Sequence, residues 1–440
     1  MTLDRRHLFT AFAGAATAAA TPAQARVETD GALRPNAAED QSKALQRLID
    51  RAAAAGAALH LPAGTYLAGG LQLPANAAIT GVPGATRILM AGGPSMMSAI
   101  GSDHVSLSDL ILDGGNIPLP EHRGLVHLAQ GRTMRIANCA IVGAGRNGIS
   151  LEAMDGEVTG NTVSAADNAI VSTDARGLRI AGNTVHGAGN GGIMVWRSTP
   201  GDDGTMVLDN RIDTIANKSG GSGQYGNGVN IFRANNVMVR GNRISNVAYS
   251  AIRGNSASNL QILGNTCTNA GEASIFSEFS FEGVVIANNI VDRAALGIIV
   301  ANFDTGGRLA VVQGNLVRNI VRRQPADPDD RSGIGIHIDA DAVASGNVIE
   351  NTAVIGIGAG YGPYLRDVTI NANVVRSADY GIAVSVVPGA GAAVISGNMI
   401  SDVRLTAIVG MEWQKTVTGD LSKEGAAHYA QLSIDGNRVR

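Results

Sequence analysis

Four ionisable residues stand at related places in a repeated phrase, and their side-chain types suit acid–base chemistry. They lie in or just after variants of the segment Gly-Ile-x-Val: Arg253, Glu278, His337 and Asp339. A lyase or epimerase needs a base and a cation for the substrate carboxylate, and Arg253 could be either, with Glu278 or Asp339 nearby. A hydrolase instead needs two carboxylates, which Glu278 and Asp339 would supply. We take these four residues as the candidate catalytic group.

Aromatic and amide side chains gather in the same part of the chain. Eight of the sixteen aromatic residues lie between positions 196 and 303, the last of them Phe303. Ligand grooves are lined by apolar and aromatic side chains with a few placed polar groups, and sugar rings stack on aromatic faces. The candidate substrate-binding residues are Trp196, Asn230, Phe232, Asn255 and Phe276.

The elements that must position these residues follow from a second phrase, hydrophobic-x-Gly-Asn-x-Val/Ile. Its Asn recurs eleven times at intervals of 22 to 39 residues: Asn161, Asn183, Asn210, Asn242, Asn265, Asn289, Asn315, Asn347, Asn373, Asn398 and Asn437. Such a period, holding three short runs with alternating apolar residues, predicts an all-β parallel β-helix with stacked Asn amides. A leucine-rich horseshoe is disfavoured because no Leu-x-x-Leu-x-Leu phrase recurs.

Stacked coils turn the companion phrase into two outward columns. In Gly-Ile-x-Val, the middle residue and the one after Val point outward, so Arg253 and Phe276 share one column while Glu278 and Asp339 share the other. Glu278 and Asp339 are two coils, about 9.6 Å, apart. Insertions at 213–227 and 318–333 should flank this region as walls, opposite walls come from 197–204 and 302–308, and the C-terminal ends of both columns are small and bland.

The first 25 residues read as an export signal. Arg5 and Arg6 begin a twin-arginine signature, an Ala-rich run follows, and Ala23-Gln24-Ala25 is a cleavage site. The run is too short for a stable membrane span. We expect a twin-arginine signal peptide over 1–25, export by that machinery to the periplasm or medium, and one β-helix domain over 26–440.

Within that domain, a helix over 40–55 should cap coils running from about 58 to 440, because an open β-helix end is an unpaired sheet edge. The net charge of −3 gives no reason to expect nucleic acid as a partner. Cys139 occupies the Asn position of an early coil and Cys267 an inward position. They stand about 24 Å apart, so both should be small buried residues without a disulfide.

Helix, then Leu59-His60-Leu61-Pro62-Ala63-Gly64-Thr65-Tyr66, Asp113-Gly114 and the Gly-Asn coils together resemble the pectate-lyase-like right-handed parallel β-helix superfamily. With the signal in front, the chain is similar to twin-arginine-translocated repeat proteins of uncharacterised function. The polygalacturonase, pectate lyase and alginate-epimerase motifs are absent, so the resemblance supplies no catalytic residue.

Two functions remain open. The chain could bind, and cleave or modify, a polysaccharide in a groove on one face, as a lyase, epimerase or hydrolase. It could instead be a non-catalytic binding or scaffold protein of the cell envelope. Calcium is a possible ligand of Asp327, Asp329 and Asp330 with Asp339 and Asp341, although a flexible acidic loop is the preferred interpretation.

Overall fold

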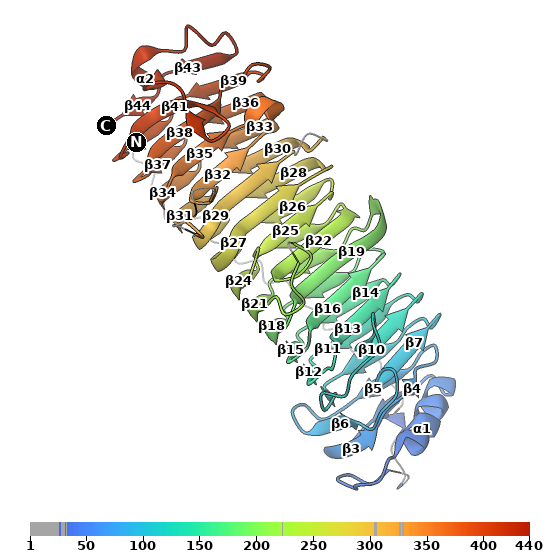
Figure 1. Cartoon of the computed structure of the whole chain (residues 1–440). Helices are drawn as coiled ribbons and strands as arrows, with labels where there is room; N and C mark the ends of the chain where they lie inside the picture. The colour runs from blue at the N-terminus through green and yellow to red at the C-terminus, as the bar shows by residue number, and fades with distance from the viewer. Residues whose placement is uncertain are drawn as a thin grey trace, which may run out of the picture.

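The computed structural model describes residues 26–27, 31, 33–221, 223–302, 306–324, 327 and 330–440. The expected signal peptide, Phe303 and Asp329 lie outside the described residues. The described chain is a rod of stacked coils, with the helix α1 at one end and the C-terminus at the other (Figure 1). Neighbouring coils pair in parallel along the rod.

One strand of each coil joins a sheet that the described residues build from 16 strands. Its members are β1 (Arg26–Val27), β2 (Ala58–His60), β5 (Ala78–Thr80), β8 (Ser106–Ser108), β11 (Met134–Ala137), β14 (Gly156–Thr159), β17 (Arg179–Ala181), β20 (Met206–Leu208), β23 (Met238–Arg240), β26 (Leu260–Leu263), β28 (Glu282–Ala287), β30 (Arg308–Gln313), β33 (Ala340–Ser345), β36 (Arg366–Asn371), β39 (Ala393–Ser396) and β43 (Leu432–Asp435).

The other two strand lines form a second sheet. Those in line with the segment after each repeated Asn are β3 (Gly64–Ala68), β6 (Thr86–Met90), β9 (Ile111–Asp113), β12 (Ala140–Val142), β15 (Thr162–Ser164), β18 (Thr184–Ala188), β21 (Arg211–Ile215), β24 (Arg243–Val247), β31 (Leu316–Ile320), β34 (Val348–Thr352), β37 (Val374–Arg376), β40 (Met399–Ser401) and β44 (Arg438–Val439). The companion strands are β4 (Leu71–Gln72), β7 (Met97–Ile100), β10 (Gly124–Ala129), β13 (Asn147–Glu152), β16 (Asn168–Thr173), β19 (Gly191–Asp202), β22 (Asn227–Asn235), β25 (Ile252–Asn255), β32 (Ile334–Ile338), β35 (Ile355–Ala359), β38 (Tyr380–Ser385) and β41 (Thr406–Glu412).

Two long strands, β27 (Thr266–Glu278) and β29 (Ile290–Ala301), belong to both of these lines at once. The first part of β27 pairs with β24 and its last part with β25, and the register shifts between Ala270 and Ala273 where β27 pairs with β29. The short strand β42 (Lys415–Thr416) returns antiparallel on β41 and closes a hairpin.

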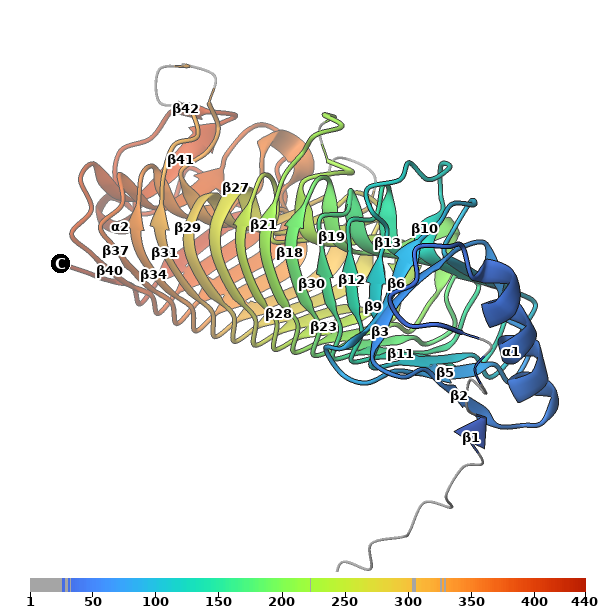
Figure 2. The same cartoon turned by 90° about the horizontal axis from the view of Figure 1, so that it is seen from below.

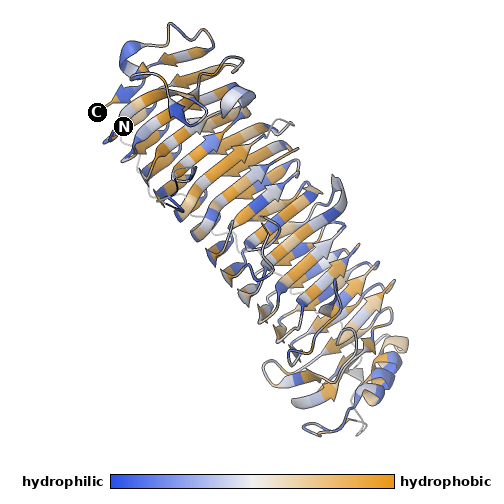
Figure 3. Cartoon of the chain, viewed as in Figure 1, coloured by the Kyte–Doolittle hydropathy of each residue, from blue (hydrophilic) through white to orange (hydrophobic). Residues whose placement is uncertain are grey.

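The core is the inside of the coils, filled by alternate Val, Ile, Leu and Ala side chains. Figure 3 shows hydrophobic residues concentrated along the strands. The Asn ladder is present as predicted: each Nδ2 from Asn161 to Asn398 donates to the Oδ1 of the next Asn at 2.9–3.0 Å. Each ladder Oδ1 also accepts the backbone N–H one coil earlier, so the ladder fixes the corner of each coil from Cys139 onward.

Both cysteines occupy the predicted positions. The Cys139 backbone N–H donates to Asn161 Oδ1 at 2.9 Å, which places Cys139 at the start of the ladder. Both thiols are free and buried, and burial raises the pKa of Cys139 to about 11 and that of Cys267 to about 12.

The capping helix is confirmed, slightly shorter than predicted. α1 spans Ser42–Ala54 and buries Leu45, Leu48 and Ile49 against the first coils. At the other end of the rod, the short helix α2 (Leu421–Glu424) packs against β41, with Leu421 buried. No described helix is long and apolar enough to cross a membrane.

The longer loops project from the companion-strand side of the rod, and short regular turns line the opposite side (Figure 2). The longer loops include the insertion before β22 and the β41–β42 hairpin. Longer loops therefore lie over the face formed by the companion strands. Their conformation determines which outward side chains of this face are accessible to a ligand.

Candidate functional site

The outward columns have the predicted register. Asn230, Arg253, Phe276, Ile299 and His337 pair in this order across five coils. Because coils stack about 4.8 Å apart, Arg253 and His337 lie three coils, roughly 14 Å, from each other. The structure therefore brings the four candidate catalytic residues together as two pairs and not as one group.

The first pair is a buried ion pair. The Arg253 guanidinium donates to Glu278 Oε1 through Nε at 2.6 Å and Nη2 at 2.5 Å, and the two side chains are 10% and 3% exposed. Asn255 Nδ2 donates to the same oxygen at 3.1 Å. The guanidinium also lies over the Phe276 ring, 5.4 Å from its centre. Arg253 is thus engaged on the protein itself.

A second carboxylate shares this ion pair. Glu272 Oε2 lies 4.0 Å from Arg253 Nη1, and Glu272 Oε1 lies 3.8 Å from Arg323 Nη1. Burial raises the pKa of both Glu272 and Glu278, although Arg253 opposes the shift in each case. Sequence reasoning missed Glu272, which precedes the companion phrase.

The first insertion covers this cluster. Asn230 Nδ2 donates to the Gln224 carbonyl at 3.0 Å, and Tyr249 donates from its hydroxyl to the Gly221 carbonyl at 3.0 Å. A Cβ on Gly223 would lie 2.2 Å from Arg253 Nη1, so the loop backbone rests directly on the guanidinium. We expected 213–227 to form a wall beside the predicted groove. Its described residues instead lie on the outward side chains and cover that groove.

Trp196 and Phe232 occupy the second column, paired in register on β19 and β22. Phe232 stacks against Arg233, whose guanidinium carbon is 4.6 Å from the ring centre. Both rings are half-buried, and Trp196 Nε1 is buried with no hydrogen-bond partner among the residues described.

An open hollow of about 570 Å³ lies further along the same face, over the C-terminal coils. We call it the C-terminal hollow. Its lining residues are Phe276, Leu296, Ile299, Ala301, Arg322, Asp330, Arg331, Ser332, Ile334, His337, Asp339, Val354, Ile355, Gly358, Gly360, Tyr361, Tyr364, Ala383, Val384, Ser385, Met411, Trp413 and Gln414. Of the nine sequence-predicted site residues, Phe276, His337 and Asp339 belong to it.

Apolar side chains on adjacent coils make the floor of the hollow. Ile355, Ala383 and Val409 form a buried cluster, and Tyr380 and Met411 pack against it. The small outward residues Gly358, Gly360 and Ala383 also line the hollow, so the C-terminal ends of the columns, expected to be bland, form part of an open site.

Aromatic side chains from loops make its rim. Tyr361 precedes the short helix η1 (Gly362–Tyr364), and its ring meets Trp413 edge-on at 5.1 Å. Trp413 stands at the turn of the β41–β42 hairpin and is 49% exposed. Arg331 of the second insertion places its guanidinium 5.2 Å from the Tyr361 ring centre. Described residues of that insertion therefore do form a wall, as predicted.

The second candidate pair lies in the hollow. His337 Nε2 and Asp339 Oδ1 are 2.9 Å apart, and Asp339 Oδ2 accepts from the Asn302 backbone N–H at 3.2 Å. With Asp339 as a carboxylate, Nε2 carries the proton and Nδ1 is the acceptor. A Cβ on Gly358 would lie 2.5 Å from Nδ1, so only a glycine leaves room for the ring. This arrangement can accept a proton from a bound molecule.

No group of three or more His, Cys, Asp or Glu residues suited to a metal ion occurs in the described parts of the chain. Two carboxylates suggested for calcium have other partners. Asp330 accepts from Ser332, and Asp341 accepts from Arg308 and Arg366. These two carboxylates are therefore engaged in loop and strand contacts.

The fold and the covered companion face define a right-handed parallel β-helix protein. Residues 92–212 and 200–316, which together span just over half of the chain, match the family model for the right-handed beta helix region, and the chain belongs to this family. No curated protein matches the chain.

Solved structures share the fold at low sequence identity. The A-module of a mannuronan C-5 epimerase from Azotobacter vinelandii aligns over 94% of this chain and 99% of its own, at 15% identity and a TM-score of 0.51. The catalytic unit of an α-1,3-glucanase from Streptomyces thermodiastaticus aligns over 96% and 70%, at 13% identity and 0.50. Bacteriophage phi29 gene product 12 aligns over 88% of this chain and 55% of its own, at 15% identity and 0.54.

Proposed function

We propose that this protein binds a polysaccharide along its companion-strand face, with the C-terminal hollow as the principal site. The carrying observation is the hollow itself: an apolar floor, a rim of Tyr361, Tyr364 and Trp413, and polar groups at His337, Asp339 and Arg331. Aromatic faces beside a few placed polar groups are what a sugar chain requires. The β-helix neighbours named for mannuronan and for α-1,3-glucan support the proposal with their fold alone.

Arginine side chains favour an acidic glycan. Arg322 and Arg331 both line the hollow, and a guanidinium binds a carboxylate through two parallel hydrogen bonds. The sequence favoured Arg253 as the residue that binds the substrate carboxylate, but Arg253 is bound to Glu278 and covered by the backbone at Gly223. The preference for uronates therefore passes from Arg253 to these two arginines.

Binding to immobilised or soluble polysaccharides, acidic and neutral, tests the proposal. One aromatic contact contributes on the order of 1 kcal/mol, so Trp413→Ala should weaken binding about five-fold. Phe232→Ala is the matched control, because Phe232 is a half-buried ring of the outward column outside the hollow. Equal loss in both variants, or loss only in Phe232→Ala, would move the site away from the hollow.

A second candidate function is uronate modification with His337 as base. The His337–Asp339 contact in the hollow favours it, since a histidine base held by a partner carboxylate can take the proton from a carbon next to a carboxylate. His337→Gln should then abolish formation of an unsaturated or epimerised uronate while glycan affinity persists. Wild-type protein that binds uronates without changing them supports the non-catalytic envelope protein instead.

We also propose export through the twin-arginine machinery to the periplasm or medium, carried by Arg5, Arg6 and the Ala23-Gln24-Ala25 site. Mass spectrometry of the exported protein should find Arg26 at the N-terminus. Changing both arginines to lysine should retain the protein in the cytoplasm, and undiminished export of that variant would remove the proposal.

A further inference from the structure

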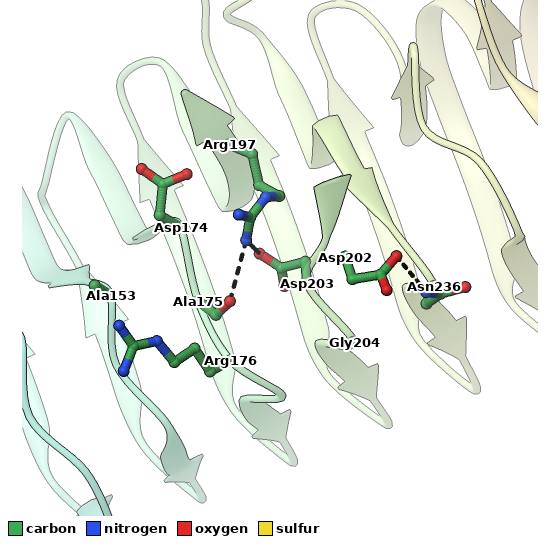
Figure 4. A pocket seen from close by; sticks show the side chains of 9 residues that line it. All are labelled: Ala153, Asp174, Ala175, Arg176, Arg197, Asp202, Asp203, Gly204 and Asn236. Atoms are coloured by element: carbon green, nitrogen blue, oxygen red, sulfur yellow. Dashed lines mark hydrogen bonds and ion pairs between the residues drawn. The ribbon is translucent and has the colours of Figure 1, made fainter. Parts of the chain in front are cut away.

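A second pocket lies at the end of β19, beside the turn that leads to β20. It has a volume of about 450 Å³. It is lined by Ala153, Asp174, Ala175, Arg176, Arg197, Asp202, Asp203, Gly204 and Asn236. We call it the Arg197–Asp203 pocket. In Figure 4 a dashed line joins the Arg197 guanidinium to the Asp203 carboxylate beside it, an ion pair at 3.9 Å. Strand β19 lies three coils, roughly 14 Å, from β27, whose Phe276 lines the C-terminal hollow, so the pocket is separate from that hollow.

Asp203 is a buried carboxylate with an unsatisfied oxygen. Its side chain is 0% exposed, its Oδ1 accepts from the Thr205 backbone N–H at 3.2 Å, and its Oδ2 has no hydrogen-bond partner among the described residues. The nearest guanidinium atom, Arg197 Nη1, stands 3.9 Å from Oδ2, beyond hydrogen-bonding distance. Burial raises the pKa of Asp203, while Thr205 and Arg197 lower it in part.

Arg197 is the complementary unsatisfied donor. Its Nη1 donates to the Ala175 carbonyl at 3.3 Å, but its Nε is buried and has no hydrogen-bond partner in the part of the chain that the structure describes. The side chain is 20% exposed, so a molecule entering the pocket meets the guanidinium first. Buried polar atoms in native proteins are normally satisfied, and here an acceptor and a donor are left open side by side.

The charges around the pocket select the class of ligand. Binding of an anion is disfavoured by three carboxylates, those of Asp174, Asp202 and Asp203. Binding of a cation is disfavoured by the guanidinium groups of Arg176 and Arg197. A neutral sugar hydroxyl both donates and accepts, so one hydroxyl can donate to Asp203 while it or its neighbour accepts from Arg197. We propose that the Arg197–Asp203 pocket is a second binding site, for one neutral sugar residue. The inference rests on the proposed function only in taking a glycan as the ligand.

Titration of the full-length chain with single sugars tests this site. The probes are D-glucose, D-galactose, D-mannose and N-acetylglucosamine, followed by saturation-transfer NMR. At least one should bind, and Asp203→Asn should weaken it about tenfold, because a hydrogen bond to a charged, desolvated group is lost. Asp155→Asn is the matched control: the same chemical change in an earlier turn, where Asp155 accepts from Thr133 outside the pocket.

Two further variants separate the possible outcomes. Arg197→Met keeps the aliphatic part of the side chain, so it should weaken sugar binding without disturbing the turn. This variant still tests the proposal if Asp203→Asn fails to fold. The loss of monosaccharide affinity caused by Asp203→Asn should persist when it is combined with Trp413→Ala, so the hollow and this pocket can fail independently. No saturable binding of any of the four sugars, or equal affinity of the Asp203→Asn and Asp155→Asn proteins, would overturn the proposal.

Discussion

The Arg253–Glu278 pair should be a structural element, and a mutant cycle can show it. Removing one partner of a buried ion pair leaves an uncompensated charge and costs about 3–5 kcal/mol of folding free energy. Glu278→Leu should fall at the lower end of that range, because Glu272 lies 4.0 Å from Arg253 and takes up part of its charge. Arg253→Met should cost more at neutral pH, because the buried Glu278 carboxylate loses its cation and the half-buried Glu272 keeps only Arg323.

The double variant Arg253→Met with Glu278→Leu decides the interpretation. Replacing both charges by apolar groups of similar size is often neutral, so much of the loss in either single variant should be recovered. The measurement is urea denaturation followed by circular dichroism, with all four proteins compared at one pH. Polysaccharide affinity, measured on the same samples, should stay unchanged in the double variant.

A pH series adds an independent check. Burial already raises the pKa of Glu278 above its ordinary 4.5, and loss of Arg253 should raise it further. The folded state of Arg253→Met then holds protons that the unfolded chain releases, so its stability deficit should be small below pH 4.5 and grow as the pH rises. Singles that each cost under about 1 kcal/mol, or a double variant that folds normally but binds no glycan, would refute the structural reading.

Three further perturbations follow from the coordinates. Asn265→Ala removes the four hydrogen bonds of a buried ladder amide, which at about 1 kcal/mol each should cost about 4 kcal/mol in denaturant unfolding; a loss below about 1 kcal/mol would mean that the ladder contributes little. Gly358→Ala should displace the His337 ring, seen as a shift of its imidazole NMR signals with the melting temperature nearly unchanged; an unmoved ring would contradict the 2.5 Å contact. Burial lowers the pKa of His127 from 6.5 to about 4, so stability should fall by about 3 kcal/mol as the pH drops between these values, and His127→Gln should lack this slope.

The fold and the columns could be predicted because each depends on the period. An Asn that recurs with the same neighbours must occupy the same corner, and the corner fixes the register of every strand around it. Arg253 therefore pairs with Phe276, and Asn255 with Glu278, as alternation requires. The period says nothing about strands that pass through a corner without turning, which is why the continuous β27 and β29 were not foreseen.

The position of the open site could not be predicted, because loop conformation decides it. Polar side chains such as Arg253 and Asn230 marked the middle coils as a groove, yet Gly223 and Gln224 lie directly on them. Tyr361 follows a companion strand whose outward residues are glycines, Trp413 follows one with apolar outward residues, and only the three-dimensional structure shows that the two rings meet. A useful signal was present, in aromatic residues placed just beyond small or apolar outward ones.

Cover and composition are linked along this face. Charged outward residues such as Arg253 and Glu278 are buried under a loop because each has a partner of opposite sign. The outward residues Ile355 and Ala383 are apolar and have no charged partner. They line the hollow, and the aromatic side chains stand at its rim without covering it. A sugar chain offers ring faces to that floor and hydroxyls to His337 and Asp339, which a protein loop with buried backbone groups would not satisfy as well. Where the loops leave the companion-strand face accessible, a bound glycan therefore satisfies the exposed groups better than a protein loop would.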